Sequence, residues 1–134
     1  MEIHIKAIGI LLISLAVIHA AFPRYFKWRE ELSTLSLINR QMMWVHTFFI
    51  AFTLLLTGVL CLLFSTDLQQ SKLGRFVCFG LGLFWGIRLL FQFFVYSPSL
   101  WKGKRFETTI HVLFSLLWLY FGVVFFSVFL TDAV

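Results

Sequence analysis

Four long apolar stretches make up most of this chain of 134 residues and decide what it can fold into. Each carries almost no formal charge and is long enough to cross the hydrocarbon core of a bilayer, which takes a helix of about 20 residues. In lipid, the backbone N–H and C=O groups at an open sheet edge would have no hydrogen-bond partner. No stretch shows the alternation of apolar and polar residues that is typical of a membrane β-barrel. The sequence therefore predicts an all-α integral membrane protein, a four-transmembrane-helix bundle with short loops, as a single domain over residues 1–134. The predicted helices cover approximately residues 4–23, 40–65, 73–97 and 107–131.

The composition excludes several other classes of protein. Hydrophobic residues make up 60% of the chain and charged residues only 13%, whereas a soluble domain carries about 25% charged residues. A water-soluble globule, a disordered chain and a nucleic-acid-binding module are therefore excluded. Two cysteines without a Cys-x-x-Cys pair also exclude a disulfide scaffold and a thiolate zinc module. Buried thiols are the favoured interpretation of Cys61 and Cys78, and a redox pair is the alternative.

The basic residues of the loops predict the orientation of the chain. Cytoplasmic loops are enriched in Lys and Arg, and seven such residues lie on the side of the first and third loops against three on the other. The seven are Arg24, Lys27, Arg29, Arg40, Lys102, Lys104 and Arg105, and the three are Lys6, Lys72 and Arg75. We therefore expect both termini to lie outside the cytoplasm, in a bacterial inner membrane, with membrane lipids as partners of the basic face.

The few polar residues of the predicted helices gather at one depth. Because alternate helices run in opposite directions, one polar residue of each helix falls about 5–10 Å below the same interface. These four residues are His19, His46, Gln92 and His111, while Arg88, Glu107 and Asn39 share their helical faces. Ionisable groups inside a membrane are costly and usually mark a functional site.

Arg88 is the only formal charge between Arg75 and Lys102. An unpaired arginine at this depth costs at least about 2.5 kcal/mol on insertion scales. We therefore expect Arg88 to face the interior and to meet a polar or anionic partner.

Three histidines on three helices favour a bound metal ion or haem, since neutral imidazole is the commonest side-chain metal ligand. We expect His19, His46 and His111 to bind iron, copper or zinc, or two of them to hold haem b. Cofactor or substrate contacts are expected from Arg88, Gln92, Glu107 and Asn39. The predicted function is redox or metal-dependent chemistry on a lipid-soluble substrate, at a site near the cytoplasmic leaflet. Whether the protein is an enzyme stays open.

Two alternatives remain. In a proton-coupled carrier or channel, the histidines and Glu107 would pass protons while Arg88 binds an anion. In a non-catalytic subunit of a membrane complex, or in a homo-oligomer, Gly82 and Gly86 would form a close-packing face. Any single histidine can also serve only to join helices through hydrogen bonds.

In architecture, four helices in a chain of this size with membrane histidines resemble the HemJ-type protoporphyrinogen oxidases and the related CopD-like membrane proteins. His4 and Lys6 are loosely similar to the opening of the first helix in that group. The resemblance implies haem or copper as cofactor. No diagnostic motif covers the other helices, so the sequence assigns no family.

Overall fold

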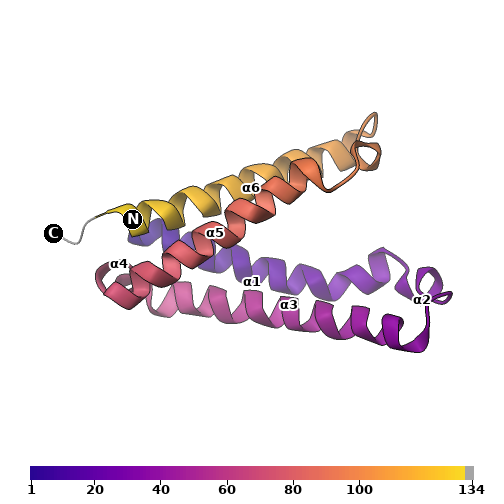
Figure 1. Cartoon of the computed structure of the whole chain (residues 1–134), viewed down its shortest axis with the longest axis horizontal. Coiled ribbons are helices and arrows are strands. Elements are labelled where there is room, and N and C mark those ends of the chain that lie inside the picture. Colours follow the sequence, from indigo (N-terminus) through magenta and orange to yellow (C-terminus); the bar gives the residue numbers. More distant parts are fainter. Residues whose placement is uncertain (132–134) are drawn as a thin grey trace. The chain divides into compact units, whose positions relative to one another are not determined.

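The computed structural model describes residues 1–131, and in this range the chain is helical without any strand (Figure 1). Four helices are long and apolar enough to cross a membrane: α1 (Glu2–Tyr25), α3 (Leu37–Leu63), α5 (Lys72–Phe94) and α6 (Arg105–Leu130). The prediction of four such helices is confirmed, and their ends differ from the predicted ones by one to three residues. This architecture is compatible with an integral membrane protein.

The chain divides into two compact units. One contains residues 5–65, with α1, the one-turn helix α2 (Trp28–Glu31) and α3. The other contains residues 1–4 and the chain from residue 66 onwards, with α5, the 3-10 turn η1 (Pro98–Leu100) and α6. The short helix α4 (Ser65–Gln70) lies at the division between them.

In the first unit, two glycines bring α1 and α3 together. A Cβ atom added at Gly9 would lie 2.8 Å from the carbonyl oxygen of Gly58, and one added at Gly58 would lie 2.8 Å from the carbonyl oxygen of Gly9. Real Cβ atoms do not approach backbone so closely, so only glycine fits at both positions. Such small residues are what lets the backbones of two membrane helices meet.

The end of α1 is set by Lys27, which adopts the left-handed conformation with φ of 52°. Pro23 lies inside the last turn of α1 and not at its end as predicted. Because proline has no backbone N–H, the helix loses only the bond from residue 23 to the carbonyl of His19 there. After Lys27 the chain makes the turn of α2, and the indole of Trp28 meets that of Trp44 edge to face, with centroids 5.4 Å apart.

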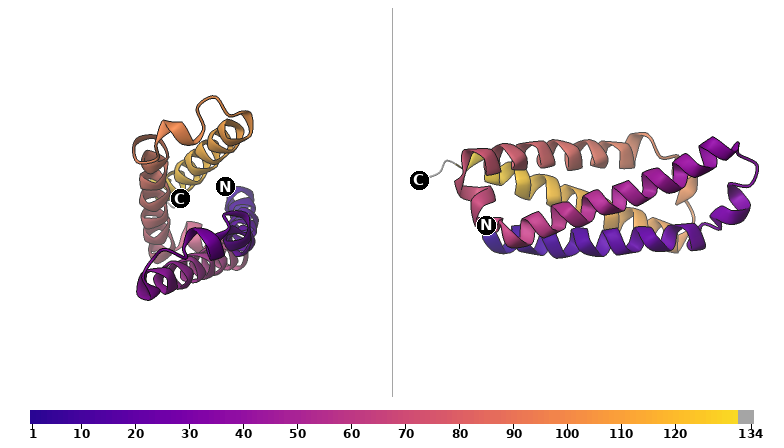
Figure 2. Two further views of the ribbon diagram at one scale, coloured as in Figure 1. Left: turned by 90° about the vertical axis from the view of Figure 1, so that its right-hand side faces the viewer. Right: turned by 90° about the horizontal axis from the view of Figure 1, so that it is seen from below.

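In the second unit, α5 and α6 pack against each other as a helical hairpin, which Figure 2 shows from two further directions. A Cβ atom at Gly82 would meet the ring of Phe126 at 3.0 Å, and one at Gly122 would lie 3.8 Å from the backbone nitrogen of Gly86. The face formed by Gly82 and Gly86 is thus used for packing within the chain.

Both ends of α5 have local causes. At its start, the Ser71 hydroxyl accepts a hydrogen bond of 2.8 Å from the backbone nitrogen of Gly74, which caps the helix. At its other end, α5 stops at Phe94, three residues before the predicted end. Ser97 is extended because the residue before a proline, here Pro98, is disfavoured in the helical region.

Candidate functional site

The predicted polar residues fall into the two units and differ in exposure. On α1 and α3, His19 is half-buried, while His46 and Asn39 are exposed. On α5 and α6, Gln92 is buried, Arg88 and His111 are half-buried, and Glu107 is exposed. Each unit therefore carries its own candidate site.

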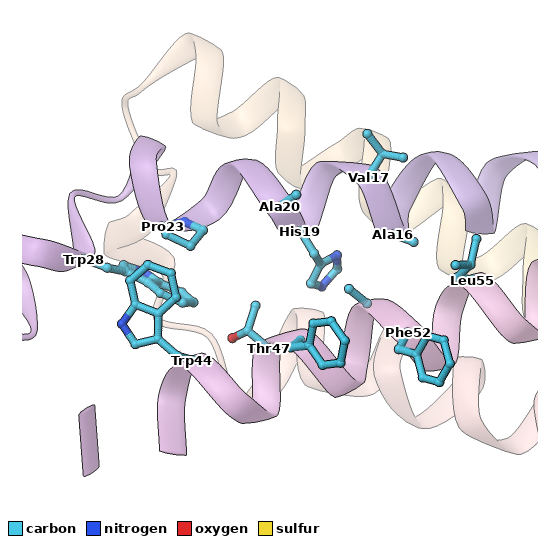
Figure 3. Close-up of a pocket in the computed structure, with 12 residues that line it drawn as sticks. Ala16, Val17, His19, Ala20, Pro23, Trp28, Trp44, Thr47, Phe52 and Leu55 are labelled. Atoms are coloured by element: carbon cyan, nitrogen blue, oxygen red, sulfur yellow. The ribbon is translucent and has the colours of Figure 1, made fainter. Parts of the chain in front are cut away.

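A pocket of about 390 Å³ lies between α1 and α3, and Figure 3 shows the twelve residues that line it. Trp28 and Trp44 lie at one end of this pocket, and Phe52 and Leu55 at the other. Most of the lining is aliphatic or aromatic, and the volume falls within the range of small-molecule sites, about 300–1,000 Å³. The first unit thus offers an apolar pocket of ligand size.

His19 projects from α1 toward α3 into this pocket (Figure 3). Its Nδ1 lies 2.7 Å from the carbonyl oxygen of Leu15, one turn earlier in α1. A carbonyl oxygen only accepts, so Nδ1 carries the proton and donates it. In the neutral ring, Nε2 then keeps its lone pair. The contact with Phe22, with centroids 4.6 Å apart, helps to hold the ring in this position.

The second candidate site lies at the loop end of the α5/α6 hairpin. The side-chain amide nitrogen of Gln92 donates a hydrogen bond of 3.1 Å to Nδ1 of His111. The indole of Trp101 stacks on the His111 ring at 3.8 Å between centroids, with an angle of 14° between the planes. Trp101 is itself held by the Thr108 hydroxyl, which donates to the Trp101 carbonyl at 2.6 Å. His111 is thereby fixed with Nδ1 as acceptor and the proton on Nε2.

Arg88 lies one turn from Gln92 on α5 and contacts two aromatic rings. Its guanidinium carbon is 5.4 Å from the ring centroid of Tyr96 and 5.4 Å from that of Trp118. Each cation–π contact contributes about 0.5–2 kcal/mol, so together they offset much of the insertion cost of the charge. Within the residues that the structure describes, Arg88 forms no hydrogen bond or ion pair. The polar partner expected from the sequence is therefore replaced by two aromatic rings.

Sequence reasoning missed these aromatic partners. Trp118 lies seven residues after His111 and so shares its face of α6. The sequence spacing alone could therefore have identified Trp118 as a residue near the site. Tyr96 and Trp101 lie in the connection after α5, where no helical spacing applies. Trp28 and Trp44 of the pocket carry no recognisable pattern.

The histidines do not form a shared metal site within either unit. His46 is exposed and is not one of the residues that line the pocket of His19. Over residues 1–131, no group of three or more His, Cys, Asp or Glu side chains is placed to hold a metal ion. A site built from His19, His46 and His111 together stays a prediction.

No protein-family model, no curated protein and no solved structure matches the chain.

Proposed function

We propose that this protein is an integral membrane protein that binds a lipid-soluble small molecule in the pocket between α1 and α3, with Nε2 of His19 as its polar contact. The observation that carries the proposal is the oriented imidazole of His19 in an otherwise mostly apolar pocket of about 390 Å³. An apolar lining with few polar groups is typical of sites that orient a small molecule.

The chemistry of the pocket limits what can bind there. A strongly polar ligand would lose its hydration without regaining hydrogen bonds, so the ligand must be mainly apolar. The four aromatic residues of the lining, Trp28, Trp44, Phe48 and Phe52, favour a ligand that contains a ring. Because Nε2 of the neutral His19 ring accepts, the ligand brings an O–H or N–H group, or a metal centre, to that nitrogen.

If the ligand at Nε2 of His19 is a metal ion or haem iron, the site would carry out redox or metal-dependent chemistry. The bond from Nδ1 to the Leu15 carbonyl is the arrangement that usually orients a metal-ligating histidine. It leaves Nε2 as the ligating atom. The sequence prediction of a metal or haem thus rests most directly on His19.

The test is to identify what the protein carries when it is purified in mild detergent. Organic extraction with mass spectrometry detects a bound small molecule, and an absorption spectrum with elemental analysis detects haem or a metal. We expect one such ligand in the wild type, and a loss of it in Ala51→Trp, which fills the pocket, and in His19→Leu, which removes the nitrogen.

The matched control is His46→Leu, which removes an exposed histidine from the neighbouring helix of the same unit. It should keep the ligand, and circular dichroism should show the same helix content in all variants. Ligand occupancy that is unchanged in Ala51→Trp would exclude this pocket. A wild type that carries no ligand and takes up no added apolar quinol or phenol would overturn the proposal.

A further inference from the structure

The α5/α6 hairpin contains an unusual excess of hydrogen-bond donors around Arg88. The indole nitrogens of Trp85 and Trp118 are buried and have no hydrogen-bond partner. These two side chains are 4% and 6% exposed, and their rings stack with centroids 4.8 Å apart. Trp118 is also one of the two rings in contact with Arg88. Unsatisfied buried donors are rare in proteins, so this part of the hairpin is rich in donors and poor in acceptors.

The other polar groups nearby do not supply the missing acceptors. The amide nitrogen of Gln92 already donates to His111, whose Nε2 carries a proton and adds a further donor. Glu107 is exposed and, in the described part of the chain, forms no ion pair with Arg88. The cluster of Arg88, Gln92 and His111, in which Arg88 has no acceptor among the described residues, is therefore complementary to a group that is rich in acceptors and negatively charged.

We infer that this cluster binds the phosphate headgroup of an anionic membrane phospholipid. The planar guanidinium of Arg88 offers N–H groups in a fork that fits two phosphate oxygens at once. The guanidinium carbon lies over the rings of Tyr96 and Trp118, 5.4 Å from each centroid, and these cation–π contacts help to hold it in place. The inference is independent of the ligand proposed for the pocket of the other unit.

The position of Arg88 favours a lipid as the source of the phosphate. It lies six residues before the end of α5, which is about 9 Å along a helix. The connection that follows and the first residue of α6 carry three exposed basic residues, Lys102, Lys104 and Arg105, which attract anionic headgroups. Large apolar side chains on the same part of α5 are exposed and can contact acyl chains: Leu90, Phe91 and Phe94. A free phosphate ion would use none of these apolar contacts.

The experiment measures lipid binding to the detergent-purified full chain by native mass spectrometry. The protein is titrated with phosphatidylglycerol, with phosphatidylcholine of the same acyl chains, and with inorganic phosphate. We expect bound phosphatidylglycerol in the wild type, little phosphatidylcholine, and no displacement by millimolar phosphate. Arg88→Gln should weaken phosphatidylglycerol binding by roughly tenfold or more, and Arg88→Lys, which keeps the charge and loses the fork, by an intermediate factor.

The control is Arg75→Gln on the same helix, because the guanidinium of Arg75 already has the Thr131 carbonyl as acceptor at 2.9 Å. This variant should bind phosphatidylglycerol like the wild type. Equal binding of the two lipids, or unchanged binding in Arg88→Gln, would overturn the inference. Binding of inorganic phosphate in place of the lipid would contradict the inference that the bound phosphate group belongs to a lipid. If Arg88→Gln does not fold, Arg88→Lys still tests the inference. Unchanged phosphatidylglycerol binding in that variant would contradict bidentate recognition.

Discussion

The side-chain amide of Gln92 on α5 donates to Nδ1 of His111 on α6, at 3.1 Å. His19 has the opposite arrangement, because its Nδ1 donates to the Leu15 carbonyl. In the neutral rings, Nε2 of His111 is thus a donor, whereas Nε2 of His19 is an acceptor. The two histidines are prepared for different partners, although the sequence presents them as equivalent.

This difference can be observed directly. In protein labelled with ¹⁵N-histidine, at a pH where the imidazoles are neutral, we expect His19 as the Nδ1–H tautomer and His111 as the Nε2–H tautomer. Signals are assigned with His19→Leu and with a His111→Leu variant. Gln92→Leu removes the amide donor to His111 and should change the tautomer signal of His111 alone. Identical tautomers at both positions would contradict the hydrogen bonds described above.

The contact between Gly9 and Gly58 predicts a sharp difference between glycine substitutions. Gly9→Ala forces its new methyl group against the Gly58 backbone, so we expect a loss of about 1–3 kcal/mol in the free energy of unfolding. Gly80→Ala is the control, because nothing lies within 4 Å of a Cβ atom there. It should be neutral or stabilise by up to about 1 kcal/mol, the helix-propensity difference. Denaturation in mixed micelles compares the two, and equal effects would contradict the close approach of α1 and α3.

The cation–π contact of Arg88 and Trp118 predicts an energetic coupling. A double-mutant cycle of Arg88→Leu and Trp118→Leu should give a coupling energy of about 0.5–2 kcal/mol. Arg88→Leu alone should leave the helices folded or even more stable, because removing a charge from an apolar environment relieves its desolvation. These quantities are measured by unfolding in mixed micelles. A coupling energy near zero would show that the two side chains do not interact.

The loop charges predict the orientation in the membrane. In a chain with Cys61→Ala and Cys78→Ala, Lys72→Cys should react with an impermeant maleimide in intact cells, since the loop charges predict an outer location for residue 72. Lys104→Cys should react only after the cells are permeabilised. The reverse pattern of labelling would place the basic loops outside and invert the predicted topology.

The helices were predictable from the sequence because length and apolarity alone identify them. Their rotation was not, since each helix is apolar nearly all round and its pattern does not fix which face is buried. For this reason His46, Asn39 and Glu107, expected at an interior site, are exposed, while Gln92 is buried as expected. The pairing of Gln92 with His111 follows from their shared depth. The roles of Tyr96 and Trp101 depend on the path of the chain after α5, which no periodicity describes.

The packing of α5 on α6 predicts how the two helices would enter a membrane during synthesis. The two helices are neighbours in sequence, and contacts between neighbours form fast because little chain entropy is lost in closing a short loop. Trp118 covers the guanidinium of Arg88 only once α6 has been made and has packed on α5. We therefore expect the insertion of α5 to depend on α6, with the two helices leaving the translocon as a pair.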